Sequence, residues 1–580
     1  MKLIHHIFLM LFTIVVCRMP LVFGSVFHVA TTGNNLNSGI ESAPWRTLTN
    51  AAKNVLPGDT VIVHSGTYNE FLVPTISGKS DSYITFRAAN GKHPIIDGTG
   101  LPVNGLTGLV NLTDIRFFRI EGFRIRSLTT SKPNGVPVGI LVRGRSEGIE
   151  IILNEIDNIT STVTVDKDLM GRDAHGIAVY GDKLTPIQNV VIRNNELRNL
   201  VLGSSEALVV NGNVSDFRII GNHIHDCDNI GIDAIGFEGI SNSSTQDQAR
   251  NGLIAGNVVW NISSKTNPAY AGEPTAAGIY VDGGREIIVE GNDVYSCDIG
   301  IEIASEHKNK STSNVFVRSN IIRNNLLGGL FVGGYDDNQT GDVLNCSVTH
   351  NTFYNNDTDS YGDEYGQIYV QYRVKKTTFY NNILFQNLKK ENGYNTFIIH
   401  WNDSGMDNIY DYNIFYGPDT PLWVMDGVTL EVFEDYSYLK STGENELWGD
   451  PNFKSPANSD FTPSIKSFAI DAAFTYKRSN EELDYYRKQR IIGVSPDCGA
   501  IEVGVQSIKI PRLIVTQKKG KITLLSHLKT GTIYSLETSI NLLKWTTIPG
   551  QDSLMFLENS FIYETEKLSA ENNFFRISVY

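Results

Sequence analysis

The sequence predicts an all-β solenoid, in which the chain winds into stacked coils of β-structure. A short glycine motif repeats from residue 139 to residue 332, and a second motif, centred on asparagine, follows it in each unit. A loose repeat with no helical stretches between its units is typical of such solenoids. The glycine motif reads Gly, apolar, any residue, apolar, and begins at Gly139, Gly176, Gly231, Gly278, Gly300 and Gly329.

The asparagine motif sets the length of one coil. It occurs at Asn195, Asn222, Asn257, Asn292, Asn320, Asn351 and Asn382. The spacing ranges from 27 residues, between the first two of these, to 35 residues, between the second and third. We expect these side chains to hydrogen-bond from coil to coil inside turns, and therefore to carry the fold and not the chemistry.

The ends of the chain differ from the repeat. Residues 1–24 read as a signal peptide, with Lys2, the apolar run IFLMLFTIVV and a small-residue exit near Gly24. That run is too short to span a membrane comfortably. We therefore expect a secreted, periplasmic or cell-surface protein, with the solenoid at residues 25–505 and a small C-terminal antiparallel β module at residues 506–580.

The start of the solenoid predicts a cap. An amphipathic helix is expected around Thr47 to Val55, followed by a turn at Pro57-Gly58-Asp59 and a strand from Thr60 to His64. A helix placed over the first coil would cover an open sheet edge and so prevent end-to-end aggregation.

This opening, APWRTLTNAAKNVLPGDTVIVHSGTY, resembles that of secreted right-handed parallel β-helix proteins of the pectate lyase-like superfamily. The resemblance covers residues 27–505 and implies a right-handed parallel β-helix. Residues 449–474 and the later PDCGAIEVG resemble the terminal coils of the same group, and residues 506–580 resemble add-on modules of secreted bacterial proteins. Because the same entrance precedes lyases, glycosidases, epimerases and binding proteins, it leaves the reaction open.

The net charge of the chain excludes some classes of binding partner. The formal net charge of −14 argues against nucleic acid or an anionic membrane. No segment is long enough for a membrane span, and no Cys or His cluster suggests zinc. We expect a monomer whose partner is a polysaccharide or oligosaccharide substrate, as the resemblance implies.

The repeat also serves as a register. The residues one and three positions after each glycine are apolar and predicted to face inward, so those two and four positions after it face outward. The middle coils place Asp233, Tyr280 and Glu302 in one outward column and Asp282 beside it. Asp233 and Glu302 would lie about 9.6 Å apart at the backbone, with Asp282 about 8 Å from either. Gly283-Gly284 predicts open space beside Asp282.

Paired carboxylates at such separations suit glycoside hydrolysis, in which one acid protonates the leaving oxygen and one carboxylate acts as nucleophile or base. We assign Asp282 as nucleophile or base and Glu302 as acid, with Asp233 modulating both. The strands GIYVD and GIEIA, which supply Asp282 and Glu302, are similar to those of β-helix β-xylosidases. The expected substrate contacts are Tyr280, Phe331, Tyr335, Tyr369, Asn211 and Glu306.

Two alternatives remain open. A hydrolase of this kind needs no cofactor, whereas a polysaccharide lyase acting on pectate or another uronate polymer would need Ca²⁺ or basic groups. Its calcium ligands would be Asp233, Asp282, Glu302 and Glu306, and its base would be Lys308, Lys310, Arg285 or Arg373. The third hypothesis is a non-catalytic glycan-binding or structural β-helix, since outward positions of any solenoid are polar where they meet water.

Overall fold

The computed structural model describes residues 24–504 except 165–170, 360–364, 389, 391–392, 402–405, 440–442, 466, 477–481 and 494. It also describes seven strands between residues 514 and 579. The predicted signal peptide lies outside the described residues, apart from Gly24.

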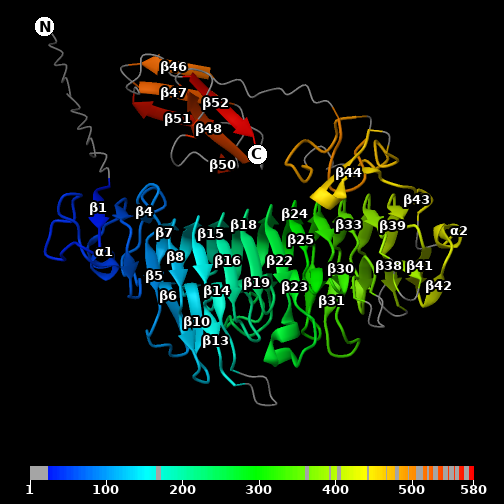
Figure 1. Ribbon diagram of the computed structural model, residues 1–580, viewed down its shortest axis with the longest axis horizontal. Helices are drawn as coiled ribbons and strands as arrows, with labels where there is room; N and C mark the ends of the chain where they lie inside the picture. Colours follow the sequence, from blue (N-terminus) through cyan, green and yellow to red (C-terminus); the bar gives the residue numbers. More distant parts are fainter. Residues whose placement is uncertain are drawn as a thin grey trace, which may run out of the picture.

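Successive coils stack into three long sheets, in which almost all neighbouring strands are parallel (Figure 1). This arrangement confirms the predicted all-β solenoid. The 12-stranded sheet contains β6 (Leu106–Thr113), β10 (Val136–Arg143), β14 (His175–Gly181), β17 (Leu208–Gly212), β20 (Ile232–Ile235), β23 (Ala277–Asp282), β26 (Ile299–Ala304), β30 (Gly328–Val332), β34 (Ile368–Val370), β38 (Tyr394–His400), β41 (Thr420–Met425) and β42 (Val428–Leu430).

The other two sheets complete each coil. The 13-stranded sheet contains β3 (Thr67–Tyr68), β5 (Ile95–Asp97), β8 (Arg124–Arg126), β12 (Glu155–Asp157), β16 (Glu196–Leu200), β19 (His223–Cys227), β22 (Val258–Ile262), β25 (Asp293–Tyr295), β29 (Ile321–Arg323), β33 (Thr352–Tyr354), β37 (Ile383–Phe385), β40 (Ile414–Tyr416) and β43 (Leu447–Trp448). The 16-stranded sheet contains β1 (Val26–Val29), β2 (Thr60–Val63), β4 (Ile84–Ala88), β7 (Arg116–Glu121), β11 (Glu147–Ile152), β15 (Ile187–Arg193), β18 (Val214–Ile220), β21 (Arg250–Ala255), β24 (Arg285–Glu290), β27 (Ser311–Ser313), β28 (Phe316–Arg318), β31 (Asp342–Leu344), β32 (Ser347–Thr349), β35 (Val374–Lys375), β36 (Thr378–Tyr380) and β39 (Ile409–Asp411).

Helices close both ends of the solenoid (Figure 1). The predicted N-terminal cap is confirmed as α1 (Leu48–Asn54), which begins after Thr47, whose side chain accepts a hydrogen bond from the N–H of Asn50. Its apolar face packs into the same core as Val29 and Val61 of the first strands. At the other end lies α2 (Phe433–Ser437), where Tyr436 stacks on Trp423 of β41 with ring centroids 4.8 Å apart.

The C-terminal region contains short antiparallel strands, which agrees with the predicted fold class. These strands are β46 (Ile514–Lys518), β47 (Lys521–Ser526), β48 (Ile533–Ser539), β49 (Thr546–Thr547), β50 (Leu554–Met555), β51 (Phe561–Glu566) and β52 (Phe574–Val579).

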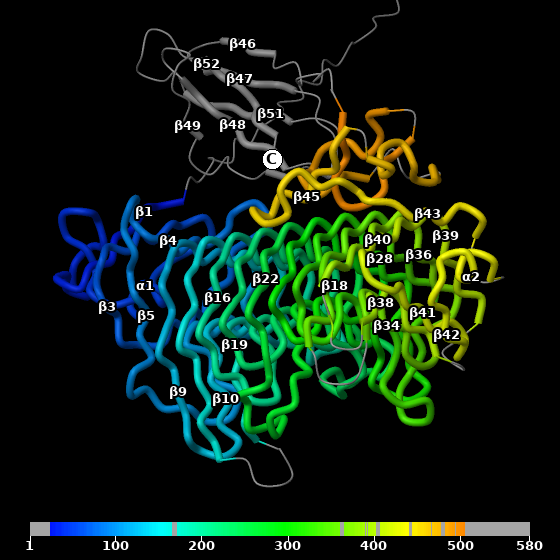
Figure 2. The backbone as a smooth tube through the Cα atoms, turned by 45° about the vertical axis from the view of Figure 1, so that its right-hand side comes forward, coloured from blue at the N-terminus to red at the C-terminus, as the bar shows by residue number. Residues whose placement is uncertain are grey.

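The described residues of 449–474 and of PDCGAIEVG (496–504) do not form terminal coils, so that prediction is wrong. The solenoid ends at β43, and the chain then forms an antiparallel pair, β44 (Phe453–Ser455) and β45 (Asp460–Pro463), and runs back over earlier coils (Figure 2). Phe461 packs on Tyr354 of β33, and Glu482 accepts a hydrogen bond from Arg318 of β28 at 2.8 Å. The segment folds back because the outer faces of these coils offer it aromatic and ionic partners.

Stacked asparagine side chains hold the coils in register. The backbone N–H and Nδ2 of Asn257 both donate to Oδ1 of Asn292, each at 2.9 Å, while Nδ2 also donates to the carbonyl of Ile219. The same links run through Asn154, Asn195, Asn222, Asn257, Asn292, Asn320, Asn351, Asn382 and Asn413. The predicted coil-to-coil ladder is therefore confirmed.

The alternation of inward and outward residues breaks at the repeat glycine, which corrects the strict period of two. A Cβ on Gly278 would lie 2.5 Å from Cγ1 of Val294 and 3.1 Å from Sγ of Cys297, both in the core. Gly278 and Ile279 therefore both face inward. Ala277, just before the glycine, packs outside with Tyr280 in a separate cluster. Each coil consequently has a third outward position on this sheet, directly before the glycine.

We expect Asn257→Ala to destabilise the protein by about 1–3 kcal/mol, because it leaves the buried N–H of Asn222 without its acceptor. The measurement is the urea-unfolding midpoint followed by circular dichroism. Asn104→Ala is the matched control, since Asn104 is exposed and its loss should change stability by less than about 0.5 kcal/mol. Equal midpoints for the two variants would contradict a ladder that stabilises the fold.

Candidate functional site

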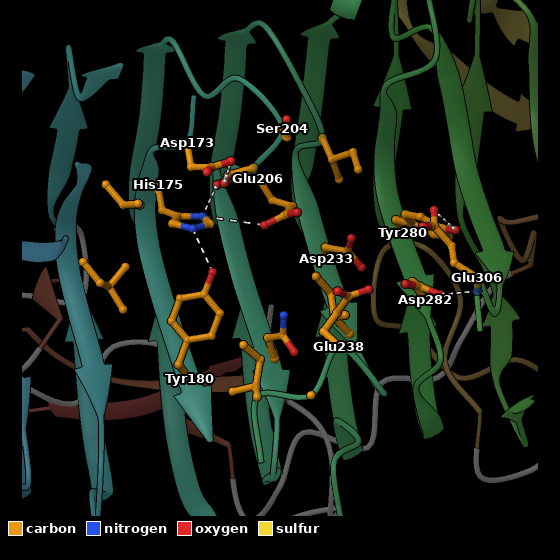
Figure 3. Close-up of a pocket in the computed structure, with 18 of the residues that line it drawn as sticks. Asp173, His175, Tyr180, Ser204, Glu206, Asp233, Glu238, Tyr280, Asp282 and Glu306 are labelled. Carbon is orange, nitrogen blue, oxygen red and sulfur yellow. Dashed lines mark hydrogen bonds and ion pairs between the residues drawn. The ribbon is translucent and has the colours of Figure 1, made fainter. Parts of the chain in front are cut away.

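A cleft of about 700 Å³ lies on the outer face of the 12-stranded sheet. Residues of β10, β14, β17, β20 and β23 and of the adjoining turns form its walls (Figure 3). Seven carboxyl groups line it, from Asp173, Asp182, Glu206, Asp233, Glu238, Asp282 and Glu306. The cleft is therefore strongly acidic, and it lies on the face that the register predicts for the site.

Strand pairing brings the central carboxyl groups together. Asp233 of β20 pairs with Tyr280 of β23, and Tyr280 pairs with Glu302 of β26, as the register predicts. Asp282 follows Tyr280 by two residues on β23 and so points to the same side. These outward positions are not open to bulk water, because Asp233, Tyr280 and Asp282 are each 5% exposed or less.

Two buried acceptors lie along the wall of the cleft. Oδ1 of Asp233 and Oδ1 of Asn211 have no hydrogen-bond partner among the described residues. A buried oxygen without a donor is costly, so such atoms are normally satisfied by water or by a ligand. This pair is therefore available to water or to a ligand that presents hydrogen-bond donors, such as hydroxyl groups.

Asp282 has a different environment. Its Oδ1 accepts the backbone N–H of Glu306 at 2.9 Å (Figure 3). The carboxylate of Glu306 in turn accepts a hydrogen bond from the hydroxyl of Tyr280 at 3.2 Å. A backbone donor favours the charged form of a carboxylate, so Asp282 is better prepared than Asp233 to hold a negative charge.

Burial and mutual repulsion raise the pKa values of these acids. Burial raises the pKa of Asp233 well above its usual range, and the charges of Glu206 and Asp282 raise it further. Burial also raises the pKa of Asp282, as does Glu306, whose backbone N–H opposes that shift. The pKa of Glu206 rises to about 8, mainly through burial. Near neutral pH the cleft therefore holds protonated carboxyl groups, because so many like charges cannot ionise together.

A histidine completes one wall. Nδ1 of His175 lies 3.0 Å from the carbonyl oxygen of Glu206 and Nε2 lies 2.9 Å from the hydroxyl of Tyr180 (Figure 3). A carbonyl only accepts, so Nδ1 carries the proton and the Tyr180 hydroxyl donates to Nε2. Burial lowers the pKa of His175 to about 4, which keeps the ring neutral.

The structure brings some of the predicted site residues together and separates others. Asp233, Asp282, Tyr280, Asn211 and Glu306 all line the cleft. Glu302 lies beside Tyr280 but is not among the lining residues, and burial followed by the charge of Glu306 raises its pKa to about 8.

Three of the four predicted aromatic contacts, Phe331, Tyr335 and Tyr369, do not line the cleft. Phe331 packs against Tyr365 and Tyr369 with ring centroids 5.2 and 5.1 Å apart. Tyr335 is 67% exposed and, like Phe331 and Tyr369, is not a lining residue. These three aromatic side chains therefore form no part of the wall around Asp233 and Asp282, and their contact with a substrate stays a prediction.

Sequence reasoning missed Asp173, His175 and Glu206. His175 directly precedes the repeat glycine Gly176, and Glu206 occupies the same position in the next coil. A strict alternation sends this position inward, whereas the break at the glycine sends it outward. Polar residues just before an apolar repeat position, where burial in the core would be costly, were the signal that could have found them.

The open space predicted beside Asp282 is also wrong. A Cβ on Gly283 would lie 2.7 Å from the carbonyl oxygen of Gly236, and one on Gly284 would lie 2.6 Å from Cδ1 of Ile287. The two glycines instead allow the turn after β23 to pack tightly against the turn after β20.

The groups proposed for a lyase lie elsewhere. Arg285 pairs with Glu286, Arg373 pairs with Asp342, and the ammonium of Lys310 lies 4.9 Å from the ring centre of Phe237. Neither these residues nor Lys308 line the cleft, where the described lining contains one Arg or Lys, Arg143, which is bound to Asp182 at 2.9 Å. Within the described part of the chain, no three His, Cys, Asp or Glu side chains are arranged to hold a metal ion.

Comparison with known proteins assigns the family. The uncharacterized protein YwoF of Bacillus subtilis (strain 168) is 34% identical over 443 residues, which cover 76% of this chain and 91% of YwoF. The chain belongs to the YwoF family. Its residues 27–199 match the Pel9A-like right-handed β-helix region, and residues 138–384 match the right-handed β-helix region. These matches confirm that this YwoF-family protein is a right-handed β-helix of the pectate lyase-like superfamily.

Solved structures resemble this YwoF-family protein in fold. Pectate lyase Pel9A aligns with a TM-score of 0.44 and 14% identity, over 83% of this chain and 96% of its own. GH136 lacto-N-biosidase from Eubacterium ramulus aligns with a TM-score of 0.44 and 14% identity, over 68% of this chain and 64% of its own. Among the described residues, no helix is long and apolar enough to cross a membrane.

Glu206 predicts a pH dependence of stability. Its pKa rises from 4.5 to about 8 on folding, so the folded state holds a proton that the unfolded state releases between these values. The resulting stability is complete below about pH 4.5 and is lost as the pH rises through 8. His175 has the opposite sign, because its lowered pKa costs stability as the pH falls from 6.5 to about 4.

Glu206→Gln isolates the first effect, because glutamine mimics the protonated acid. We expect the variant to gain about 1 kcal/mol or more relative to the wild type between pH 4.5 and pH 8, measured from unfolding midpoints in urea. Glu444→Gln, at an exposed position, serves as the control and should show no such trend. A difference between Glu206→Gln and wild type that does not vary with pH would contradict the raised pKa.

Proposed function

We propose that this protein is an exported glycoside hydrolase that cleaves a glycosidic bond of a polysaccharide or oligosaccharide in the acidic cleft. One observation carries the proposal: two carboxyl groups, Asp233 and Asp282, line one cleft with different hydrogen-bond environments. The pKa values of both groups are raised, so the hydrogen bond that only Asp282 receives from a backbone N–H is the difference from which we assign the acid and the base.

Asp233 is the proposed general acid. It is buried, its Oδ1 receives no donor from the described residues, and its pKa is raised by burial and by the neighbouring charges. A carboxyl group held protonated near neutral pH can donate its proton to the glycosidic oxygen as the bond to the leaving sugar breaks.

Asp282 is the proposed nucleophile or base. The N–H of Glu306 stabilises its charged form, and each neighbour that stays protonated removes a repulsive charge. Asp233 and Asp282 lie diagonally across neighbouring strands, which sets their backbones about 8 Å apart. Side chains of this length bring the carboxyl groups within the range of about 5–9.5 Å used by glycosidases.

This assignment moves the acid from Glu302 to Asp233. Glu302 lies behind Tyr280 and does not line the cleft, so its proton has no direct path to a bound substrate. Its charge does raise the pKa of both Asp233 and Asp282, which supports a modulating role.

Sugar hydroxyl groups suit the rest of the lining. Oδ1 of Asn211 and of Asp233 are acceptors without donors from the described chain, and Tyr280, which pairs with Asp233 on the neighbouring strand, adds an aromatic lining residue. Export is supported by the signal-like residues 1–24, of which only Gly24 is among the described residues.

We expect Asp282→Asn and Asp233→Asn each to reduce cleavage by about 10²–10⁴-fold, because each removes one of the two proton-handling groups. The assay screens neutral and uronate polysaccharides and records both new reducing ends and near-ultraviolet absorbance. Hydrolysis gives reducing ends without absorbance. Absorbing, unsaturated products would instead establish a lyase.

Asp216→Asn is the matched control, since Asp216 is exposed on β18 in the 16-stranded sheet and should retain full activity. Each variant should keep the wild-type circular dichroism spectrum and unfolding midpoint. Glycan binding with no product from any polymer of the screen would indicate the non-catalytic alternative.

A further inference from the structure

The acidic cleft is one end of a longer groove. A second cavity of about 400 Å³ shares Leu106, Arg143 and Asp182 with the cleft. A third cavity, of about 730 Å³, shares Asp114 and Lys183 with the second. The third cavity continues beside Arg116 of β7, Glu147 of β11 and Gln188 of β15 in the 16-stranded sheet, while the cleft and the second cavity extend over the coils from β23 to β6. Five strand spacings make this span about 24 Å, enough for several sugar residues of one polymer.

The far part of the groove is basic where the cleft is acidic. Its second and third cavities are bordered by Arg143, Lys183, Arg145 and Arg116, all exposed. We call these four residues the basic arm. The acids there are Asp114, Asp182 and Glu147, so the cations outnumber the carboxylates, whereas the cleft has seven carboxyl groups and one arginine.

Hydrogen bonds within the basic arm leave donors for a ligand. Oδ2 of Asp182 accepts a hydrogen bond from Nε of Arg143 at 2.9 Å and another from Nζ of Lys183 at 3.1 Å, so two cations share one carboxylate. The side chains of Arg143 and Lys183 remain 44% and 45% exposed. The outer guanidinium nitrogens of Arg143 can then meet a carboxylate in the two-pronged geometry that arginine favours.

We propose that the groove binds a mixed polysaccharide, with uronate residues at the basic arm and a neutral sugar at the cleft. The position of the neutral sugar rests on the proposed hydrolase, since the carboxyl cluster would repel a second anion beside Asp233 and Asp282. The position of the uronate rests on the basic arm alone. Long-range repulsion from the net charge of −14 is screened within about 10 Å in 0.1 M salt, whereas direct contacts are not.

Binding of defined polymers to the full-length Asp282→Asn protein tests this inference. The probes are glucuronoxylan, rhamnogalacturonan and xanthan, each before and after chemical reduction of its carboxyl groups, with a sulfated galactan for comparison. We expect at least one native polymer to bind about tenfold more tightly than its reduced form at low salt, a preference that shrinks as salt is added. Equal affinity for native and reduced forms of all three would overturn the proposal, as would equal binding of the sulfated galactan.

Charge variants locate the effect. Lys183→Gln with Arg145→Gln should remove most of the preference for the native polymer, because both side chains are exposed and border the groove. Lys53→Gln with Arg46→Gln changes the net charge equally at exposed positions outside the groove and should keep the preference. The opposite pattern would place the polymer elsewhere and refute the basic arm.

Cleavage by the wild-type protein is scored separately from binding. Charge-dependent binding without any reducing ends would refute the hydrolase and leave the basic arm standing. Cleavage of neutral polymers, with no preference for carboxyl groups in the binding assay, would support the hydrolase and refute the basic arm.

Discussion

Hydrogen bonds between stacked asparagine side chains set the register on which the rest of this protein depends. Each Asn side chain is buried, and its amide is satisfied by the coil before it and the coil after it. A slip of one residue would leave several of these groups unpaired at once, at a cost of about 1–3 kcal/mol each. The ladder therefore fixes which outward side chains lie above one another, and places Asp233 opposite Tyr280 and diagonal to Asp282.

Two loops enclose this outward column and shield its carboxyl groups from bulk water. The loop after β20 and the loop after β26 meet where Glu238 and His307 lie 2.7 Å apart and Lys310 lies over the ring of Phe237. With the turns drawn together, Asp233 and Asp282 lose their contact with bulk water although they point away from the core. Desolvation then raises their pKa values, which is what a carboxylic acid needs in order to hold a proton near neutral pH.

The period of the sequence was enough to predict the coils, the ladder and the column of Asp233, Tyr280 and Glu302, and an amphipathic segment before the repeat predicted the capping helix. The period could not predict that His175 and Glu206 line the cleft. The repeat glycines, such as Gly278, face inward and lie close to the opposite sheet, which breaks the alternation that the prediction assumed. Nor could the period predict that Phe331 and Tyr369 lie outside the cleft, where their rings pack against Tyr365. The return of residues 449–504 depends on contacts such as Arg318 with Glu482, which are far apart in the chain and leave no periodic trace.

The state of the proton donors and acceptors in this cleft supports the proposed hydrolase over the lyase alternative. A lyase of the kind considered above needs a nitrogen base to remove a carbon-bound proton, and the described lining of the cleft offers two side chains of that kind, Arg143 and His175. Arg143 binds Asp182, and both nitrogens of His175 are used, one as a donor to a carbonyl and one as an acceptor from Tyr180. Hydrolysis needs a proton donor beside a carboxylate. The proposed acid, Asp233, is buried and its Oδ1 has no partner among the described residues, while the proposed carboxylate, Asp282, accepts a backbone N–H. The same residues that crowd negative charge into the cleft thus supply its acid, because their repulsion is relieved only when some of them keep their protons.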